Sequence, residues 1–318
     1  MYVKTALLSL LLIGVSGLRA DVTLRYKTEV NINPNLPSAM QGLSAMDAVI
    51  PHEMILQYRD GKGATSQGAM TSIADFAKQE LTILDHQGKR YSTLPYAQYA
   101  DAATAAMPRV SGQAAGMLAG MKTHSESKIT GHSATIQGIE ADEREFDITI
   151  DPPDLPNMPA VPGPMIRLVM HFWMAKPGEI IRVPAVREVL GYGQFAAATM
   201  NPMSSVEKIL GQMPLTPDIM GLIKDLHSAG TNFVLRTQVE MFMPMLDALF
   251  KRTPAGASPF GANFDPSAPL MTMNQELASI STETVSEAAF RVPDGYQPAP
   301  AADILKDLMA KAQAPGKQ

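Results

Sequence analysis

Apolar and polar residues alternate strictly between Asp21 and Ile32. Because successive side chains on a strand point to opposite faces, this period of two predicts a strand with one apolar and one solvated face. Pro34 and Pro37 end the pattern. Shorter stretches of strand character, separated by turn residues, predict further strands. They cover residues 54–59, 64–71, 81–85, 90–94, 127–137, 140–150, 167–175, 232–243 and 270–285. Their order indicates an antiparallel meander.

Three regions have helical character instead. Residues 96–107 are rich in alanine, residues 184–226 carry apolar positions at helical spacing, and residues 301–314 predict a short amphipathic helix. The sequence therefore predicts an α+β fold, in which one curved antiparallel β-sheet forms a half-barrel and a helical insertion at 184–230 covers one face. We expect a single domain over residues 21–300, followed by a C-terminal helix or tail over residues 301–318.

Residues 1–20 have the three-part layout of a secretory signal peptide. Lys4 supplies a positive charge, Ala6–Val15 form an apolar run, and small and polar residues lead to Ala20. The apolar run is too short to span a bilayer, and no later segment offers about 18 uninterrupted apolar residues. We therefore expect an exported protein with no transmembrane span after signal cleavage. The periplasm is the first expectation for its location, and the extracellular space is the alternative.

Composition and motifs exclude several classes of function. The chain has 26 Lys and Arg against 31 Asp and Glu, a formal net charge of -5, so it lacks the basic surface that nucleic-acid binding needs. The absence of cysteine excludes disulfides, zinc–thiolate sites and thiol catalysis. Neither a serine-hydrolase elbow nor a phosphate-binding loop occurs in the mature chain. We expect no enzyme activity and no cofactor.

The six histidines lack the spacing of a metalloprotease. His124 and His132 are the best pair for a metal because a hairpin could bring them together, although ordinary surface histidines explain them more simply. The predicted set of metal ligands is therefore empty.

Methionine is the unusual component, with 22 in 318 residues. Flexible thioethers can repack around varied apolar ligands, and their soft sulfurs can also hold Cu(I). Gap filling in a core, together with the composition of the lineage, is a third explanation. The predicted inward face is apolar and rich in methionine, and its residues are the candidate ligand-lining set. They are Leu168, Met170, Phe172, Met174, Phe233, Leu235, Met241 and Met243.

Five stretches carry a resemblance to a known family. They are Val22-Thr-Leu-Arg-Tyr, Leu81-Thr-Ile-Leu-Asp with Lys89-Arg-Tyr-Ser-Thr-Leu after it, the Gly138-centred segment 136–146, His171-Phe-Trp-Met-Ala, and Ala289-Phe-Arg-Val-Pro-Asp-Gly-Tyr. In this order they resemble exported bacterial proteins of unassigned function that share the half-barrel of the periplasmic lipoprotein carriers (LolA-like). The resemblance implies a half-barrel capped by helices, with a hydrophobic interior suited to acyl chains, and it supplies no catalytic residues. The insertion at Pro184–Gly230 is a departure that could fill this interior with protein.

Together these features predict an exported, non-catalytic protein that binds an apolar ligand, such as a lipid or a lipoprotein acyl chain, on a methionine-rich concave sheet. Two alternatives stay open. One is a structural or interaction protein of the cell envelope with a filled core, and the other is a methionine-based Cu(I) binder.

Overall fold

The computed structural model describes residues 21–36, 50–106, 120–153, 163–200, 233–246, 265 and 267–313. The strands are β1 (Val22–Ile32), β2 (Glu53–Arg59), β3 (Lys62–Gln67), β4 (Met70–Asp75), β5 (Glu80–Asp85), β6 (Arg90–Pro95), β7 (Lys122–Ile136), β8 (Ile139–Asp151), β9 (Ile166–Ala175), β10 (Val234–Phe242), β11 (Met271–Ser281) and β12 (Gln297–Pro298). The helices are α1 (Tyr99–Ala106), α3 (Pro177–Arg182), α4 (Pro184–Met200) and α8 (Ala301–Gln313), with short 3-10 turns η2 (Tyr96–Gln98) and η3 (Glu287–Phe290).

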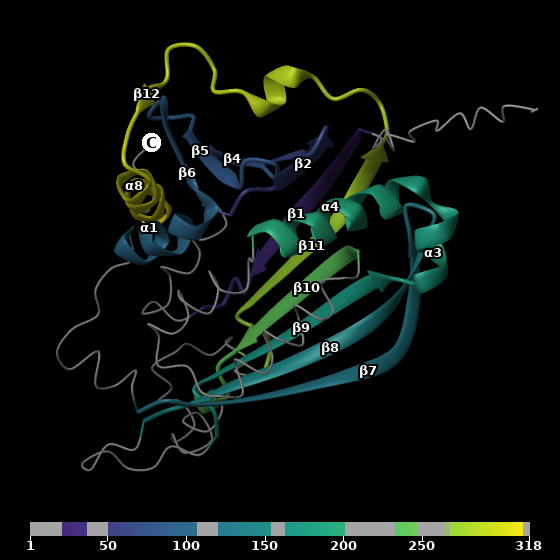
Figure 1. The fold of residues 1–318 in the computed structure, drawn as a ribbon. Helices are drawn as coiled ribbons and strands as arrows, with labels where there is room; N and C mark the ends of the chain where they lie inside the picture. The colour runs from purple at the N-terminus through teal and green to yellow at the C-terminus, as the bar shows by residue number, and fades with distance from the viewer. Residues whose placement is uncertain are drawn as a thin grey trace, which may run out of the picture.

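The described strands form one open, curved sheet of 12 strands in the order β12-β6-β5-β4-β3-β2-β1-β11-β10-β9-β8-β7. All their pairings are antiparallel except that of the short β12 with β6. β1 lies between the meander β2–β6 and the long strand β11, so the first strand joins the two halves of the sheet (Figure 1). The prediction of a sheet-dominated α+β fold is confirmed at this level.

Most predicted elements lie where the sequence places them, and two turns differ. The single polar strand predicted over residues 64–71 is two strands, because the chain turns at Gly68 with φ 57° and begins β4 at Met70. In the β5–β6 turn the positive φ falls on Lys89, not on Gly88. Gly88 is needed for a different reason, since a Cβ there would collide with the Asp85 carboxylate.

The meander is covered on both faces. On one face, Leu81, Ile83 and Leu94 pack with Ala301 and Ile304 of α8. On the other face, Leu84 packs with Ala64 and Ile73 and is covered by three residues of the C-terminal segment, Phe290, Val292 and Tyr296. Figure 1 shows this segment passing over the meander through η3 to β12, before α8 returns beside α1.

The largest core cluster surrounds α4. It combines Val22 and Leu24 of β1 with Val186 and Leu190 of α4, all 8% exposed or less. Figure 1 shows α4 lying across β1 and β11. The helical prediction at 184–230 is therefore confirmed as far as residue 200, and residues 201–230 lie outside the described residues, as does the segment 1–20. No helix in the described part of the chain is long and apolar enough to cross a membrane.

Candidate ligand-binding face

The long strands bring apolar side chains into two rows that cross five strands. Register places Ile148, Leu168, Met241, Met271 and Ile32 opposite one another in the first row. The second row, two residues further along each strand, consists of Phe146, Met170, Val239, Met273 and Val30. We call these ten residues the apolar ladder. At a strand spacing of about 4.8 Å it is about 19 Å wide.

Most of the apolar ladder is partly accessible. Phe146 and Ile148 are buried, and the eight residues on β9, β10, β11 and β1 are all half-buried. Phe172 extends the apolar surface from β9, and its ring meets Phe146 edge-on, with 5.5 Å between centroids. Aromatic and thioether groups in this arrangement present a continuous, deformable apolar surface.

A polar row closes one end of the apolar ladder. Beyond the second row, Arg144, Phe172, Thr237, Gln275 and Thr28 lie opposite one another across the same five strands. Gln275 donates from Nε2 to Thr28 Oγ1 at 3.1 Å, and the Arg144 guanidinium lies 5.8 Å from the centroid of the Phe146 ring. The apolar ladder therefore ends at a boundary with one cation and several hydrogen-bonding groups.

The opposite face of the same strands is polar. Arg167 bonds both carboxylate oxygens of Asp147, and Arg236 donates to Glu276 at 2.5 Å. Arg236 also lies over the Trp173 ring, 5.1 Å from its centroid. The alternation read from the sequence thus separates an ion-paired face from an apolar face, as the period of two requires.

The predicted ligand-lining residues are divided among three clusters. Leu168, Met170 and Phe172 pack together with Phe146 and Ile148. Met241 and Met243 pack against Leu246 and Leu270, with Met243 lying just after β10. The structure joins the first cluster to Met241 through cross-strand pairing, and these four predicted residues belong to one surface.

The structure corrects the predicted ligand-lining set at Phe233 and Leu235. Both are buried, at 5% and 0% exposure, in the core cluster that includes α4. Leu235 keeps the two-residue spacing of Thr237, Val239 and Met241, but it is covered within this cluster, which also contains Leu277 of β11. Phe233 lies beyond a β-bulge between Val234 and Arg236, which breaks the period of two in the pairing with β9. Met174 lies opposite Val234 at the same irregularity.

Seven members of the apolar ladder were missed from the sequence, and two of them, Phe146 and Ile148, lie within the predicted strand 140–150. Val30 and Ile32 lie on the predicted apolar face of the first strand, and Val239 lies within the predicted strand 232–243. Met271 and Met273 lie within the predicted strand 270–285. Their alternation was the available signal, but only the pairing of β11 with both β1 and β10 shows that they meet the other methionines.

The candidate pairing of His124 with His132 across a hairpin does not occur, since both residues lie on one strand, β7. His124 pairs with Asp151, while His132 shares the carboxylate of Glu143 with His171. Glu143 is 5% exposed. Burial alone would raise the pKa of this carboxyl, but hydrogen bonds from Thr130, His132 and His171 outweigh it and the pKa is lowered.

Glu143, together with Thr130, His132 and His171, forms a cluster that stabilises a bulge in β7. Residues 130–132 of β7 interrupt the register opposite Glu143, and Thr130 and His132 bond its Oε2, each at 2.6 Å. His171 of β9 bonds the other oxygen at 2.8 Å. Among the described residues no group of three or more His, Asp and Glu side chains is arranged to hold a metal ion.

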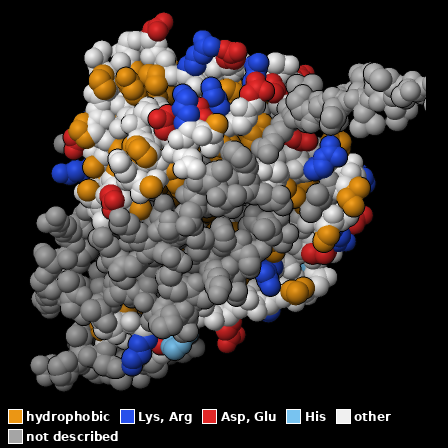
Figure 2. Space-filling model, in the orientation of Figure 1, with side chains coloured by type: hydrophobic (Ala, Val, Ile, Leu, Met, Phe, Trp, Pro, Cys, Tyr) orange, Lys and Arg blue, Asp and Glu red, His pale blue; other side chains and the backbone are white. Residues whose placement is uncertain are grey.

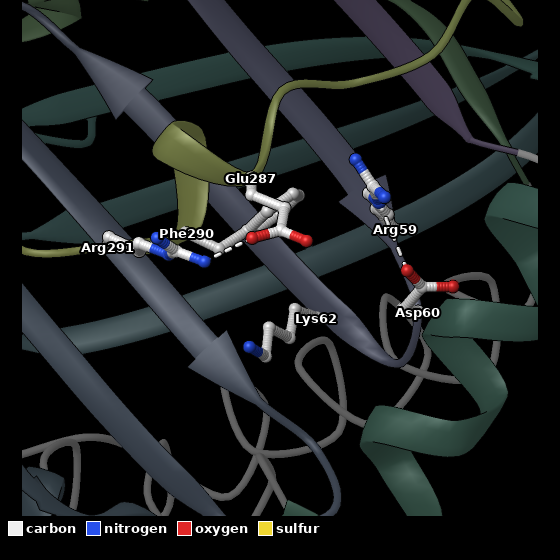
Figure 3. Close-up of a pocket in the computed structure, with 6 residues that line it drawn as sticks. All are labelled: Arg59, Asp60, Lys62, Glu287, Phe290 and Arg291. Carbon is white, nitrogen blue, oxygen red and sulfur yellow. Dashed lines mark hydrogen bonds and ion pairs between the residues drawn. The ribbon is translucent and has the colours of Figure 1, made fainter.

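Two small polar pockets lie elsewhere. The first, of about 140 Å³, lies between the β2–β3 turn and η3, where Arg59 pairs with Asp60 and Arg291 pairs with Glu287 beside Lys62 (Figure 3). Charged side chains of both signs gather over this end of the molecule (Figure 2). The second, of about 170 Å³, is lined by polar-face residues that include Lys27 and Glu276. Neither pocket contains a member of the apolar ladder.

Comparisons with known proteins do not assign a family. No family model matches the chain, and no curated protein matches it. Nine chains of solved structures match, among them PNGF-II in space group C2, with 9% identity and a TM-score of 0.32. That match covers 92% of this chain and 33% of PNGF-II, so the chain spans about a third of that protein's length. Such a TM-score does not establish a common fold.

Proposed function

We propose that this protein is exported and binds an apolar molecule without catalysis, in the form of a lipid or a lipoprotein acyl chain lying along the apolar ladder. The single observation that carries the proposal is the alignment of ten apolar side chains in two rows across five strands, eight of them half-buried. Rows of this kind offer a linear apolar surface about 19 Å wide. An extended acyl chain has matching shape and chemistry.

The finer description of the fold belongs to the same proposal. We take the curved sheet as a half-barrel of the LolA-like kind, with the insertion that begins at α4 covering part of one face. The LolA-like resemblance of the sequence favours the same class of ligand. Secretion into the periplasm, or beyond it, would give the protein access to envelope lipids.

The polar row suggests the orientation of the ligand. Arg144 is half-buried and lies two residues before Phe146 on β8, at the end of the apolar ladder. An anionic head group, phosphate or carboxylate, would find a cation there, while the polar side chains Thr237 and Gln275 lie in the same row. The acyl chain would then extend along the rows away from Arg144.

Native mass spectrometry of protein purified from the envelope of its own host is the direct test, and a co-purifying lipid is the expected result. Displacement of a fluorescent fatty acid then measures the affinity. Val239→Thr inserts a hydroxyl in the middle of the second row without changing the shape of the side chain. It should weaken binding at least about five-fold, since burying an unpaired hydroxyl costs about 1–3 kcal/mol.

The matched control is Gln238→Thr, which makes the same residue at the adjacent position on the polar face. It should leave the affinity unchanged. If no lipid co-purifies and no fluorescent fatty acid binds, the protein is better explained as an envelope component whose sheet is filled by its own chain. Equal weakening by both substitutions would show that the ligand binds somewhere other than the apolar ladder.

A further inference from the structure

Three methionines lie next to one another within the apolar ladder. Met241 on β10 is directly opposite Met271 on β11, and Met273 lies two residues further along β11 on the same face. Residues directly opposite in an antiparallel pair have Cβ atoms about 4.5–5.5 Å apart, and diagonal neighbours are about 7–8 Å apart. Because methionine is unbranched and has three rotatable side-chain bonds, three sulfurs at these positions can converge on one point.

The surroundings of these sulfurs suit a soft metal and no other kind. The neighbours in the two rows are Val30, Ile32, Leu168, Met170 and Val239, so no carboxylate or carbonyl group of the ladder side chains competes with the thioethers. Hard cations such as Ca²⁺ and Mg²⁺ require oxygen ligands, whereas thioether sulfur selects Cu(I). All three methionines are half-buried, which leaves them within reach of a metal carrier or of a free ion.

We propose that Met241, Met271 and Met273 form a three-sulfur binding site for Cu(I). The ion binds without changing oxidation state, and the chain has no cysteine to compete for it. This assignment differs from a pairing of Met241 with Met243, because Met243 lies after the end of β10 and beyond the last residue of β10 that pairs with β11. It does not depend on lipid binding.

The test uses leucine in place of methionine. Met271→Leu and Met241→Leu keep the side chains apolar and of similar size but remove one sulfur each. Cu(I) is titrated anaerobically into the mature protein against a chromophoric Cu(I) chelator. The wild-type protein should retain one Cu(I) per chain. Since loss even of a residue behind a metal ligand costs about 10–100-fold in affinity, each variant should bind at least about ten-fold more weakly.

Met54→Leu is the matched control, since Met54 is half-buried on β2 and packs against the core cluster around α4, away from the apolar ladder. Its affinity for Cu(I) should equal that of the wild-type protein. X-ray absorption of the copper-loaded protein should show three sulfur neighbours. Absence of Cu(I) binding in the wild-type protein, or unchanged binding in both Met271→Leu and Met241→Leu, would overturn the site.

The same variants separate this site from the proposed function. Leucine preserves the apolar surface, so Met271→Leu should bind a fluorescent fatty acid as the wild-type protein does while it loses Cu(I). If Met271→Leu loses both ligands, the substitution disturbs the apolar ladder itself. The copper site is then rejected, unless Met241→Leu loses Cu(I) binding and keeps fatty-acid binding. A wild-type protein that binds Cu(I) but no fatty acid contradicts only the lipid proposal.

Discussion

The two halves of the sheet are built from the same alternating pattern and use it differently. In the meander β2–β6 the strands have six or seven residues, and both faces of β5 are covered, one by α8 and the other by the C-terminal segment. In β7–β11 the strands have nine to fifteen residues, with ion pairs on one face and the half-buried apolar ladder on the other.

This difference predicts that stability and the proposed binding can be separated. A side chain covered on every side contributes its whole apolar area to folding, whereas a half-buried one keeps part of that area available for a partner. β1 connects the two halves, since Val22 and Leu24 pack in the core cluster around α4 and Val30 and Ile32 join the apolar ladder. We expect substitutions in the meander to affect unfolding, and substitutions in the apolar ladder to affect binding.

The sharpest test of this contrast truncates one residue in each half. Ile83→Ala removes a side chain that is 1% exposed beneath α8 and should lower the free energy of unfolding by about 3–4 kcal/mol. Leu168→Ala, in the half-buried apolar ladder, should lower it by only about 1–2 kcal/mol but weaken fatty-acid binding. Urea unfolding and fluorescent ligand titration of both variants measure the two effects. Equal destabilisation, with binding intact in Leu168→Ala, would remove the distinction.

The next largest expected loss of stability comes from removing the charge of Asp85. Its carboxylate is fully buried and accepts from Gly88 N–H at 2.9 Å and from Arg90 Nη2 at 2.7 Å. Burial alone would raise the pKa of Asp85, but these bonds and the nearby Lys311 outweigh it and the pKa is lowered. Asp85→Asn should therefore cost about 2–3 kcal/mol at pH 7, because Arg90 loses its buried partner.

The lowered pKa of Asp85 determines how its contribution to the free energy of unfolding depends on pH. A carboxyl whose pKa is lower in the folded state stabilises the fold fully above its unfolded value, near 4, and loses this contribution as pH falls through the folded value. Asp85→Asn should thus unfold with a smaller loss of stability below pH 4 than the wild-type protein. Asp307→Asn is the control, since Asp307 also pairs with Arg90 but is half exposed and should cost no more than about 1 kcal/mol.

The alternation of apolar and polar residues predicted the individual strands better than it predicted the apolar ladder that they form together. Strict alternation between residues 21 and 32 was sufficient to predict β1, and the apolar run at 167–175 predicted β9, whose ten residues are all buried or half-buried. What the sequence could not predict was which distant strands are neighbours. β1 pairs with β11, about 250 positions away, and this pairing creates the apolar ladder.

Irregularities explain part of the wrong assignments. One extra residue at Leu235 interrupts the pairing of β10 with β9, and three residues at 130–132 bend β7, but neither insertion changes the hydropathy of its strand. Phe233 and Leu235, predicted to line the ligand, are buried in the core cluster around α4. The Glu143 cluster was missed for a different reason, because its histidines come from the two strands on either side of β8.

Removing the Glu143 charge should have a moderate, local effect. Glu143→Gln weakens the contacts that fasten residues 130–132 and should cost about 1–2 kcal/mol, since His132 is largely exposed. Amide hydrogen exchange at residues 130–133 should speed up, while exchange in the meander stays slow. Asp142→Asn, an exposed neighbour on β8 that bonds Ser133, is the control, with less than about 0.5 kcal/mol expected. Uniformly faster exchange would contradict a local role.

The smallest effect at neutral pH concerns Tyr58, whose ring stacks on Tyr192 of α4 with 4.8 Å between centroids. Burial, with Tyr192 nearby, raises the pKa of Tyr58 to about 12. The unfolded chain ionises this phenol near pH 10, so the wild-type protein loses stability as pH rises from 10 to 12. Tyr58→Phe keeps the ring in place and should change stability at pH 7 by less than about 0.5 kcal/mol, while reducing the alkaline loss.

Tyr26→Phe is the informative companion to Tyr58→Phe. The Tyr26 hydroxyl donates to the backbone oxygen of Val234 at 2.9 Å, across the join between the two halves of the sheet. Its loss should cost about 1 kcal/mol already at pH 7, the usual net contribution of one hydrogen bond. Unfolding curves of both variants at pH 7 and pH 11 decide the matter. If Tyr26→Phe is neutral at pH 7, this bond does not hold β1 to β10, and the two halves are joined by strand pairing and apolar contact alone.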